Sequence, residues 1–509
     1  MVDPDTSSDQ SATIRDEELV KKTSELDAAA KDPFLIDEFE EGDPTNPRNW
    51  SRLRRWYLTF FAGVLLLNAT FASAAPSGIT LEMRREFHMS QEVGVLALSI
   101  FVAGYVVGPL LWGPLSENVG RRPIFIFPHI VFTLFQVGAA LAKNQASLLV
   151  FRFLGGVFAA APLTNSGAII SDIWDANTRG KALALFTLMP FTGPTLGPTV
   201  SGFIAVSGTS FRWVYWTLAI FAGVCSIFAV LTLPETYKPV LLIRAAKRKR
   251  EETGDNRYYA PLEKDRRSFL QQVENVLARP FKILFLEPML FVITIYMSFI
   301  FGNVFLLFEA FPIVFTVGHG LNAGLTGLTF LPIALGGTVA TIFSASYYNP
   351  RYERKAAELA PHPVPPEFRL EMTLLASPLY AISFFWFAWT SFPSISLWAP
   401  LMSGFVMGFA INLIFLSLFN YIIDTYLFVA ASALAGSTVV RSLCGAAFPL
   451  FATQMYDALG PRWASSLLGF VALIMMPLPF VFVRYGPAIR ARSRYAPAKP
   501  TPASNKLEA

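Results

Sequence analysis

Long apolar segments alternate with short polar connections along most of this chain. A helix needs about 20 mostly apolar residues to cross a bilayer core, and twelve segments meet that criterion. They lie near residues 56–76, 93–112, 124–142, 147–170, 181–206, 213–233, 285–308, 322–347, 372–391, 395–420, 427–452 and 463–483. Because several connections are only a few residues long, consecutive helices must lie antiparallel and side by side. The pattern predicts an all-α polytopic membrane protein.

Positive charge is distributed unevenly between the two sides of this predicted bundle. An even number of spans puts both termini on one side, and that side receives 34 of the 41 Lys and Arg residues. The other side receives 5, and 2 lie within spans. Without the 12 charges of the long central connection the ratio is still 22 to 5. Since basic loops mark the cytoplasmic side, we expect both termini in the cytoplasm.

The polar segments divide the chain into five predicted parts. They are an acidic cytoplasmic tail (1–46), a six-helix half (47–234), a basic cytoplasmic linker (235–284), a second six-helix half (285–485) and a basic tail (486–509). The first tail has 14 acidic and 4 basic residues and almost no apolar pattern, which predicts disorder. The basic linker either lies against the anionic inner leaflet or stays solvated and only fixes the topology.

Composition excludes an ordinary soluble protein and several chemistries. The chain is 53% hydrophobic and 15% charged, whereas a soluble domain has about a quarter of its residues charged. The pI of 9.0 therefore does not indicate nucleic-acid binding. Both cysteines lie in apolar segments, no two of the four histidines have metal-ligand spacing, and no phosphate-binding Gly-rich loop is present. We expect no metal, no cofactor and no enzymatic activity.

The loop between the second and third spans has a distinctive sequence, Gly113-Pro-Leu-Ser-Glu-Asn-Val-Gly-Arg-Arg-Pro123. Gly113 permits close helix approach and Gly120 permits a tight turn. Arg121 and Arg122 would hold the loop on the cytoplasmic side. Glu117 is placed to sit against the positive N-terminal end of a neighbouring helix.

The fifth span contains Gly193-Pro-Thr-Leu-Gly-Pro-Thr-Val-Ser-Gly202. Pro194 and Pro198 each remove a backbone hydrogen bond, and neighbouring helices must satisfy the freed carbonyls. Gly193, Gly197 and Gly202 supply a small face for close packing. The segment is either a coupling element or a purely structural kink.

These sequences resemble signatures of the major facilitator superfamily. The loop matches the family's G-x-L-x-D-x-x-G-R-R/K signature except for Glu117 in place of Asp. Arg152-Phe-Leu-Gly-Gly156 is similar to its buried-arginine motif, and the fifth-span sequence to its antiporter motif. Phe308-Glu-Ala-Phe-Pro312 and Arg441-Ser-Leu-Cys-Gly-Ala-Ala-Phe-Pro449 resemble fungal twelve-span drug:proton antiporters. The resemblance implies two pseudo-symmetric six-helix halves and multidrug or secondary-metabolite efflux.

Ionisable side chains inside spans are costly and therefore candidates for function. The proton-coupling candidates are Glu309, Asp424, Arg152 and Arg441, because a carboxylate in low dielectric exchanges protons more readily. The alternatives are a side chain reaching the interface for Glu309, a salt bridge at the cytoplasmic gate for Asp424, and helix-to-helix contacts for the arginines. The resemblance favours coupling for Arg152.

The resemblance also implies that spans 1, 4, 7 and 10 line a central cavity. The candidates on those spans are Asn68, Asn165, Ser166, Phe301, Asn303, Phe305, Phe308 and Asn412. The three phenylalanines share one helical stripe, although any one of them could equally face lipid or pack between helices. An aromatic pocket favours bulky amphipathic ligands, and few charges argue against polyamines and organic acids.

The function implied by the resemblance is proton-coupled efflux of hydrophobic or amphipathic molecules by alternating access. The expected partners are a small-molecule substrate, protons and the lipid bilayer, with no nucleic acid, and the protein is expected to be a monomer. The expected membrane is the plasma membrane, with the vacuolar membrane as alternative. Two other functions remain open: a proton symporter or uniporter importing a nutrient, and a non-transporting receptor.

Overall fold

The structure is a computed structural model that describes residues 32–40, 42–175, 178–264, 269–360, 362 and 364–496. The described residues form two compact units, a small one from residues up to 49 and 237–267, and a large one from residues 50–236 and 268 onward. The predicted disorder of residues 1–46 falls mostly on residues outside the described part.

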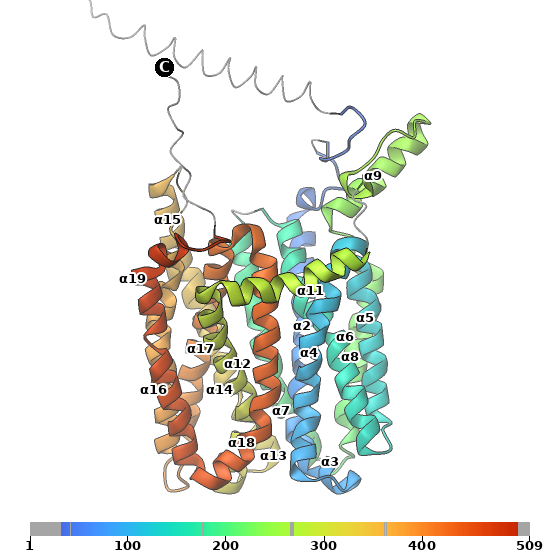
Figure 1. Cartoon of the computed structure of the whole chain (residues 1–509). Helices are drawn as coiled ribbons and strands as arrows, with labels where there is room; N and C mark the ends of the chain where they lie inside the picture. The colour runs from blue at the N-terminus through green and yellow to red at the C-terminus, as the bar shows by residue number, and fades with distance from the viewer. Residues whose placement is uncertain are drawn as a thin grey trace, which may run out of the picture. The chain divides into compact units, whose positions relative to one another are not determined.

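The large unit consists of helices joined by short connections (Figure 1). The helices of its first half are α2 (Arg52–Ala74), α3 (Thr80–Phe87), α4 (Gln91–Val119), α5 (Arg121–Ala140), α6 (Gln145–Ile173), α7 (Arg179–Val206) and α8 (Arg212–Thr232). Those of its second half are α11 (Phe269–Leu286), α12 (Pro288–Phe311), α13 (Ala323–Leu328), α14 (Leu331–Phe343), α15 (Asn349–Leu359), α16 (Glu371–Thr390), α17 (Trp398–Thr425), α18 (Ala430–Met475) and α19 (Leu478–Arg490).

The predicted spans agree with this helix pattern. Within the described residues, ten helical stretches are long and apolar enough to cross a membrane. The last stretch, Ser432–Arg490, holds both of the final predicted spans, because two helices meet within α18 at Gly460, whose backbone is not helical (φ 70°, ψ 160°). The fifth predicted span is α7, which is not among the ten. Dividing the last stretch and adding α7 gives the twelve spans of the all-α fold.

Local sequence sets several helix ends. Ser51 caps α2 by accepting the Arg54 N–H, and Asn144 forms a capping box with Ser147 at the start of α6. The predicted seventh span begins at 288 instead of 285, because Pro288 opens α12 after a break at Glu287. The preceding helix α11 contacts α4 and α18 and lies across their ends (Figure 1).

Equivalent helix pairs pack with their backbones in contact in both halves. The second and fourth spans, α4 and α6, meet where a Cβ on Gly156 would lie 2.0 Å from the Phe101 carbonyl oxygen. The eighth and tenth spans, α14 and α17, meet in the same way, because a Cβ on Gly408 would lie 2.0 Å from the Ile333 carbonyl oxygen. Neither position can hold a side chain without moving a helix. The two halves are therefore built by the same close backbone packing.

The two halves touch along α4 with α18 and along α7 with α13 and α14. Near the predicted outer end, Thr199 Oγ1 donates to the Gly327 oxygen at 2.8 Å. A Cβ on Gly202 would lie 2.3 Å from the Ala323 oxygen. The halves are thus in backbone contact at the predicted outer end.

The small unit contains η1 (Pro47–Asn49), α9 (Lys238–Thr253) and α10 (Pro261–Lys264). The basic part of the predicted linker forms α9, whose buried Leu242 and Ala246 belong to the same apolar cluster as Ile36. Leu35 and Tyr259 form an isolated parallel bridge. Residues 32–40 of the acidic tail therefore pack within this unit, on the apolar face of α9.

Replacing Gly156 with alanine is expected to lower the free energy of unfolding by about 1–3 kcal/mol, because the new methyl group would overpack α4 against α6. The matched control is Gly167→Ala in the same helix, where a Cβ meets nothing within 4 Å and helix propensity improves. Thermal unfolding of both detergent-solubilised variants measures the difference. Equal melting temperatures would contradict the close packing of these spans.

Candidate substrate and proton sites

Arg152 in α6 is completely buried and fully engaged with neighbouring helices. Its Nε donates to the Ala97 oxygen at 3.0 Å, Nη1 to the Ala72 oxygen at 2.8 Å and Nη2 to the Ser73 oxygen at 3.3 Å. Its Cζ also lies 4.2 Å from the centre of the Phe101 ring. The Ala72 and Ser73 carbonyls belong to the last turn of α2, where partial negative charge collects. Arg152 therefore joins α2, α4 and α6.

Arg441 in α18 is buried in a different way. It is 8% exposed, and its Cζ lies 5.1 Å from the Phe301 ring centre, 5.3 Å from Phe419 and 5.5 Å from Phe415. Its one hydrogen bond among the described residues joins Nη2 to Thr438 Oγ1 at 3.5 Å, while Nε has none. Arg441 forms no salt bridge within 4 Å with those residues. This guanidinium is surrounded by rings and has few polar contacts.

Glu309 lies near the predicted outer end of α12 and is half-buried. Arg84 is the charged group of the described chain that acts on it, although the two do not form a salt bridge within 4 Å. Arg84 lies in α3, in the first half, and its Nε has no hydrogen-bond partner there. The attraction between the two side chains therefore crosses from one half to the other.

Asp424 lies near the predicted cytoplasmic end of α17 and is part of an ion pair. Arg369 Nε donates to its Oδ2 at 2.7 Å, and Arg369 Cζ lies 3.6 Å from the Tyr352 ring centre. This is the geometry of a salt bridge at that end of the bundle. Arg369 was not singled out from the sequence, because it lies in a loop that is not apolar.

The loop between α4 and α5 is held by a network of side chains from α4 and α6. Arg121 Nη1 donates to Ser116 Oγ at 2.5 Å, and Ser116 donates to Asn165 Oδ1 at 2.7 Å. Arg121 Nε pairs with Asp172 Oδ2 at 3.4 Å. Asn165, expected to line a cavity, therefore uses its polar atoms within the first half.

The carboxylate at the N-terminus of α5 is Glu235. Its two oxygens accept the backbone N–H groups of Arg121 at 2.8 Å and Arg122 at 3.2 Å. The close approach requires Gly120, whose φ is 100° and whose Cβ would lie 2.4 Å from Glu235 Oε2. Glu117, for which this position was expected, is exposed and makes no hydrogen bond or ion pair with other described residues. The contact of Glu235 with this loop could not be predicted from the sequence, because Glu235 lies 115 positions further along the chain than Gly120.

The glycine and proline motif of α7 places this helix against both halves. A Cβ on Gly193 would lie 2.0 Å from Thr70 Oγ1 of α2, and one on Gly197 would lie 2.9 Å from the Ala74 backbone. Gly202, one turn beyond Pro198, instead meets the backbone of α13. The motif therefore belongs to the contact that closes the predicted outer end.

The other predicted cavity residues fall into two groups. Ser166 donates to the Ala62 oxygen at 3.3 Å, inside the first half. Three asparagines keep polar atoms without a hydrogen-bond partner in the described chain. Asn68 lacks partners for both amide atoms, and the Cys225 thiol lies beside it. Asn303 lacks one for Oδ1, and Asn412 lacks one for Nδ2.

The phenylalanine stripe of α12 forms a continuous series of ring contacts. Ring centres are 5.1 Å apart for Phe301 and Phe305, and 5.7 Å for Phe305 and Phe308. Phe308 continues the series to Phe330 at 5.2 Å, so the outer part of the stripe packs within the second half. Phe301 is half-buried and ends the series beside Arg441.

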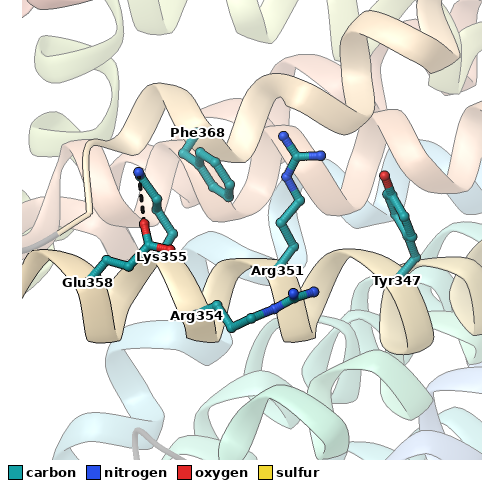
Figure 2. A pocket seen from close by; sticks show the side chains of 6 residues that line it. All are labelled: Tyr347, Arg351, Arg354, Lys355, Glu358 and Phe368. Carbon is teal, nitrogen blue, oxygen red and sulfur yellow. Dashed lines mark hydrogen bonds and ion pairs between the residues drawn. The ribbon is translucent and has the colours of Figure 1, made fainter.

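A separate pocket lies at the predicted cytoplasmic end (Figure 2). It has a volume of about 400 Å³ and is lined by Tyr347, Arg351, Arg354, Lys355, Glu358 and Phe368. Lys355 pairs with Glu358 at 3.0 Å, as the dashed line in Figure 2 marks. None of the predicted cavity residues lines this pocket.

Two six-helix halves with equivalent packing, and charged side chains buried between their helices, define a multi-pass membrane transporter. Residues 60–449 match the family model described as Major Facilitator Superfamily. The chain belongs to this superfamily, whose members carry small molecules.

Curated relatives cover almost the whole chain. An efflux pump of Fusarium oxysporum is 42% identical over 466 residues, which are 91% of this chain and 78% of the relative. A multidrug transporter of this superfamily from Aspergillus fumigatus is 42% identical over 92% of this chain and 76% of the relative. The citrinin biosynthesis cluster transporter of Monascus ruber is 40% identical over 97% of this chain and 99% of the relative.

Solved structures support the fold. A proton:xylose symporter bound to a bromodeoxyglucose has a TM-score of 0.60 at 16% identity, with 85% of this chain and 97% of that chain covered. At this identity the likeness concerns the fold alone. It confirms the expectation of an all-α major facilitator fold.

Replacing Glu235 with alanine is expected to lower the free energy of unfolding by about 1–3 kcal/mol, because two backbone N–H groups at the start of α5 would lose their acceptor. Glu117→Ala removes a carboxylate of the same loop that is exposed, and is expected to change stability by less than about 0.5 kcal/mol. Thermal unfolding in detergent compares the two variants. A larger loss for Glu117→Ala would reverse the assignment.

Proposed function

We propose that this protein exports hydrophobic or amphipathic small molecules in exchange for protons, by alternating access. The substrates are xenobiotics such as fungicides, or a secondary metabolite of the producing cell such as a toxin. It acts in the plasma membrane as a monomer with both termini in the cytoplasm, and it carries out no chemical conversion.

The observation that carries this proposal is the similarity to efflux pumps along nearly the whole chain. The relatives named as efflux pump and multidrug transporter match 91% and 92% of it, so both halves and the packing between them are included. The aromatic surface at Phe301, Phe415 and Phe419 suits amphipathic ligands. Nutrient import has no comparable support, because the sugar symporter shares only 16% identity.

Glu309 is the better proton carrier of the two candidate acids. An ionised carboxylate is costly to bury, so the state with a closed outer end holds Glu309 best when it is protonated. The attraction of Arg84 compensates only part of this cost, because no salt bridge forms. Protonation from outside would then favour closure of the outer end, and proton release inside would favour its reopening.

Asp424 and Arg152 have other roles in this scheme. Asp424 is held by Arg369 at 2.7 Å, and this ion pair joins two segments of the second half at the cytoplasmic end. Arg152 fixes α2, α4 and α6 as one body through three backbone carbonyls. It thereby transmits any movement of the fourth span to the first.

Replacing Glu309 with glutamine is expected to abolish export against a gradient, because glutamine imitates the protonated acid and carries no proton. Exchange of labelled for unlabelled substrate is expected to remain, since it needs no proton turnover. The measurement is accumulation of a fluorescent amphipathic drug in yeast cells lacking their own pumps, with and without an uncoupler. Exchange is then followed in proteoliposomes.

Asp424→Asn serves as the comparison for this variant. It also removes one acid of the second half, but it breaks an ion pair and should leave the uncoupler-sensitive part of export in place. If the Glu309→Gln variant still exports in an uncoupler-sensitive way, Glu309 is not the proton site. If only the Asp424→Asn variant loses this export, the proton site is Asp424.

A further inference from the structure

The two buried arginines of the spans differ in how well their hydrogen-bonding groups are satisfied. Arg152 donates to three carbonyl oxygens, whereas Arg441 makes one contact of 3.5 Å and leaves Nε without an acceptor. We propose that Arg441 and the rings of Phe301, Phe415 and Phe419 form a binding site for the carboxylate of an amphipathic organic acid. This inference rests on the proposed export function and names its substrate class.

The main argument is the unused hydrogen-bonding capacity of Arg441. A guanidinium has five N–H donors, and a buried charge is stable only when it is paired and hydrogen-bonded. Ring faces attract the cation, but they do not replace acceptors for its N–H groups. A carboxylate supplies two acceptors in the geometry of the guanidinium fork. The site is therefore complete only with an anion.

Two further donors lie on the same helix faces as the rings. Ser298 lies three positions before Phe301 on α12, and its buried hydroxyl has no partner in the described chain. Asn412 lies seven positions before Phe419 on α17, and its Nδ2 has no acceptor there. Residues three or seven apart on a helix share a face. The Ser298 hydroxyl can thus add a hydrogen bond to a bound acid. The Asn412 amide lies against Gly337 and Thr341 of α14, so its N–H belongs to that contact.

The site lies where the two halves meet. The Phe415 ring centre is 5.5 Å from that of Phe191 on α7, in the first half. Gly445, one turn beyond Arg441, faces both Phe301 and Val102 of α4, in the first half. In alternating access this inter-half surface opens to each side in turn. The ligand of Arg441 can therefore be a transported substrate.

The surroundings select the kind of anion. Arg441 is the cation of the proposed site and forms no salt bridge with another described residue, so a single negative charge is matched, and a phosphate dianion is not. The half-buried Phe301 and Phe419 and the buried Phe415 give the site aromatic walls for an apolar body. The substrate class is a monocarboxylic acid with a bulky apolar part, although the small number of charges in the spans argued against organic acids.

The test measures binding of 2-naphthoate and of its neutral analogue 2-naphthamide to the purified full-length protein by equilibrium dialysis at pH 7.5. Three variants are compared with the unmodified protein. Arg441→Gln removes the charge, and Arg441→Lys keeps it without the fork. Arg462→Gln is the matched control, because Arg462 is also stacked on a ring, with its Cζ 3.6 Å from Trp389, but lies outside the proposed site.

The unmodified protein is expected to bind 2-naphthoate about tenfold more tightly than 2-naphthamide, since a charged hydrogen bond is lost in the amide. Arg441→Gln should weaken 2-naphthoate binding by about tenfold or more and leave 2-naphthamide within about threefold, which also shows that the variant is folded. Arg441→Lys should fall between, and Arg462→Gln should bind both compounds normally.

The proposal is overturned if the unmodified protein binds the acid and the amide equally, or if both Arg441 variants keep full affinity for the acid. Proteoliposome transport separates this inference from the proposed export. Arg441-dependent binding without proton-driven movement of 2-naphthoate would retain the anion site and reject export. If both compounds are exported in a proton-driven way and Arg441→Gln does not change this export, the export function is retained and the anion site is rejected.

Discussion

Backbone contact between helices is the constraint on which the rest of this structure depends. Lipid tails are as apolar as the side chains between the spans, so helices associate through close packing and internal hydrogen bonds. At Gly156 and Gly408 the approach leaves no room for a Cβ, and these positions occupy equivalent helix pairs of the two halves. The same close contact recurs between the halves at Gly202 and Gly327. Halves that are each packed this closely can move as bodies relative to one another, as a rocking movement requires.

The helices and their order could be predicted from the sequence because each span can be recognised from its own residues. Length, hydropathy and capping residues such as Ser51 act within one segment, and twelve spans followed from them. The turn at Gly460 falls in the predicted connection between the last two spans, whereas the break at Glu287 was not predicted. The position of that break depends on a few residues at a span boundary, where hydropathy changes too gradually to locate an end.

The candidate sites were less predictable because they depend on contacts between distant segments. Burial of Arg152 and Arg441 in spans was visible from the sequence, but their different surroundings were not, because the partners Ala72 and Phe415 lie on other helices. Glu235 reaches the start of α5 from the end of the sixth span. Asn165 was expected in the cavity from its span alone, and its hydrogen bond from Ser116 could not be predicted because Ser116 lies on another helix.

In the proposed exchange, Glu309 and Arg441 would together determine how the membrane potential drives transport. They lie in the same half, on α12 and α18, which pack against each other. An exported carboxylate carries one negative charge outward and an imported proton carries one positive charge inward, so two charges move down the potential in each cycle. Each charge contributes about 2.3 kcal/mol per 100 mV, whereas a neutral substrate would gain from one charge only. In the proposed exchange, the charge of the acid that Arg441 binds would therefore double the electrical driving force for its export.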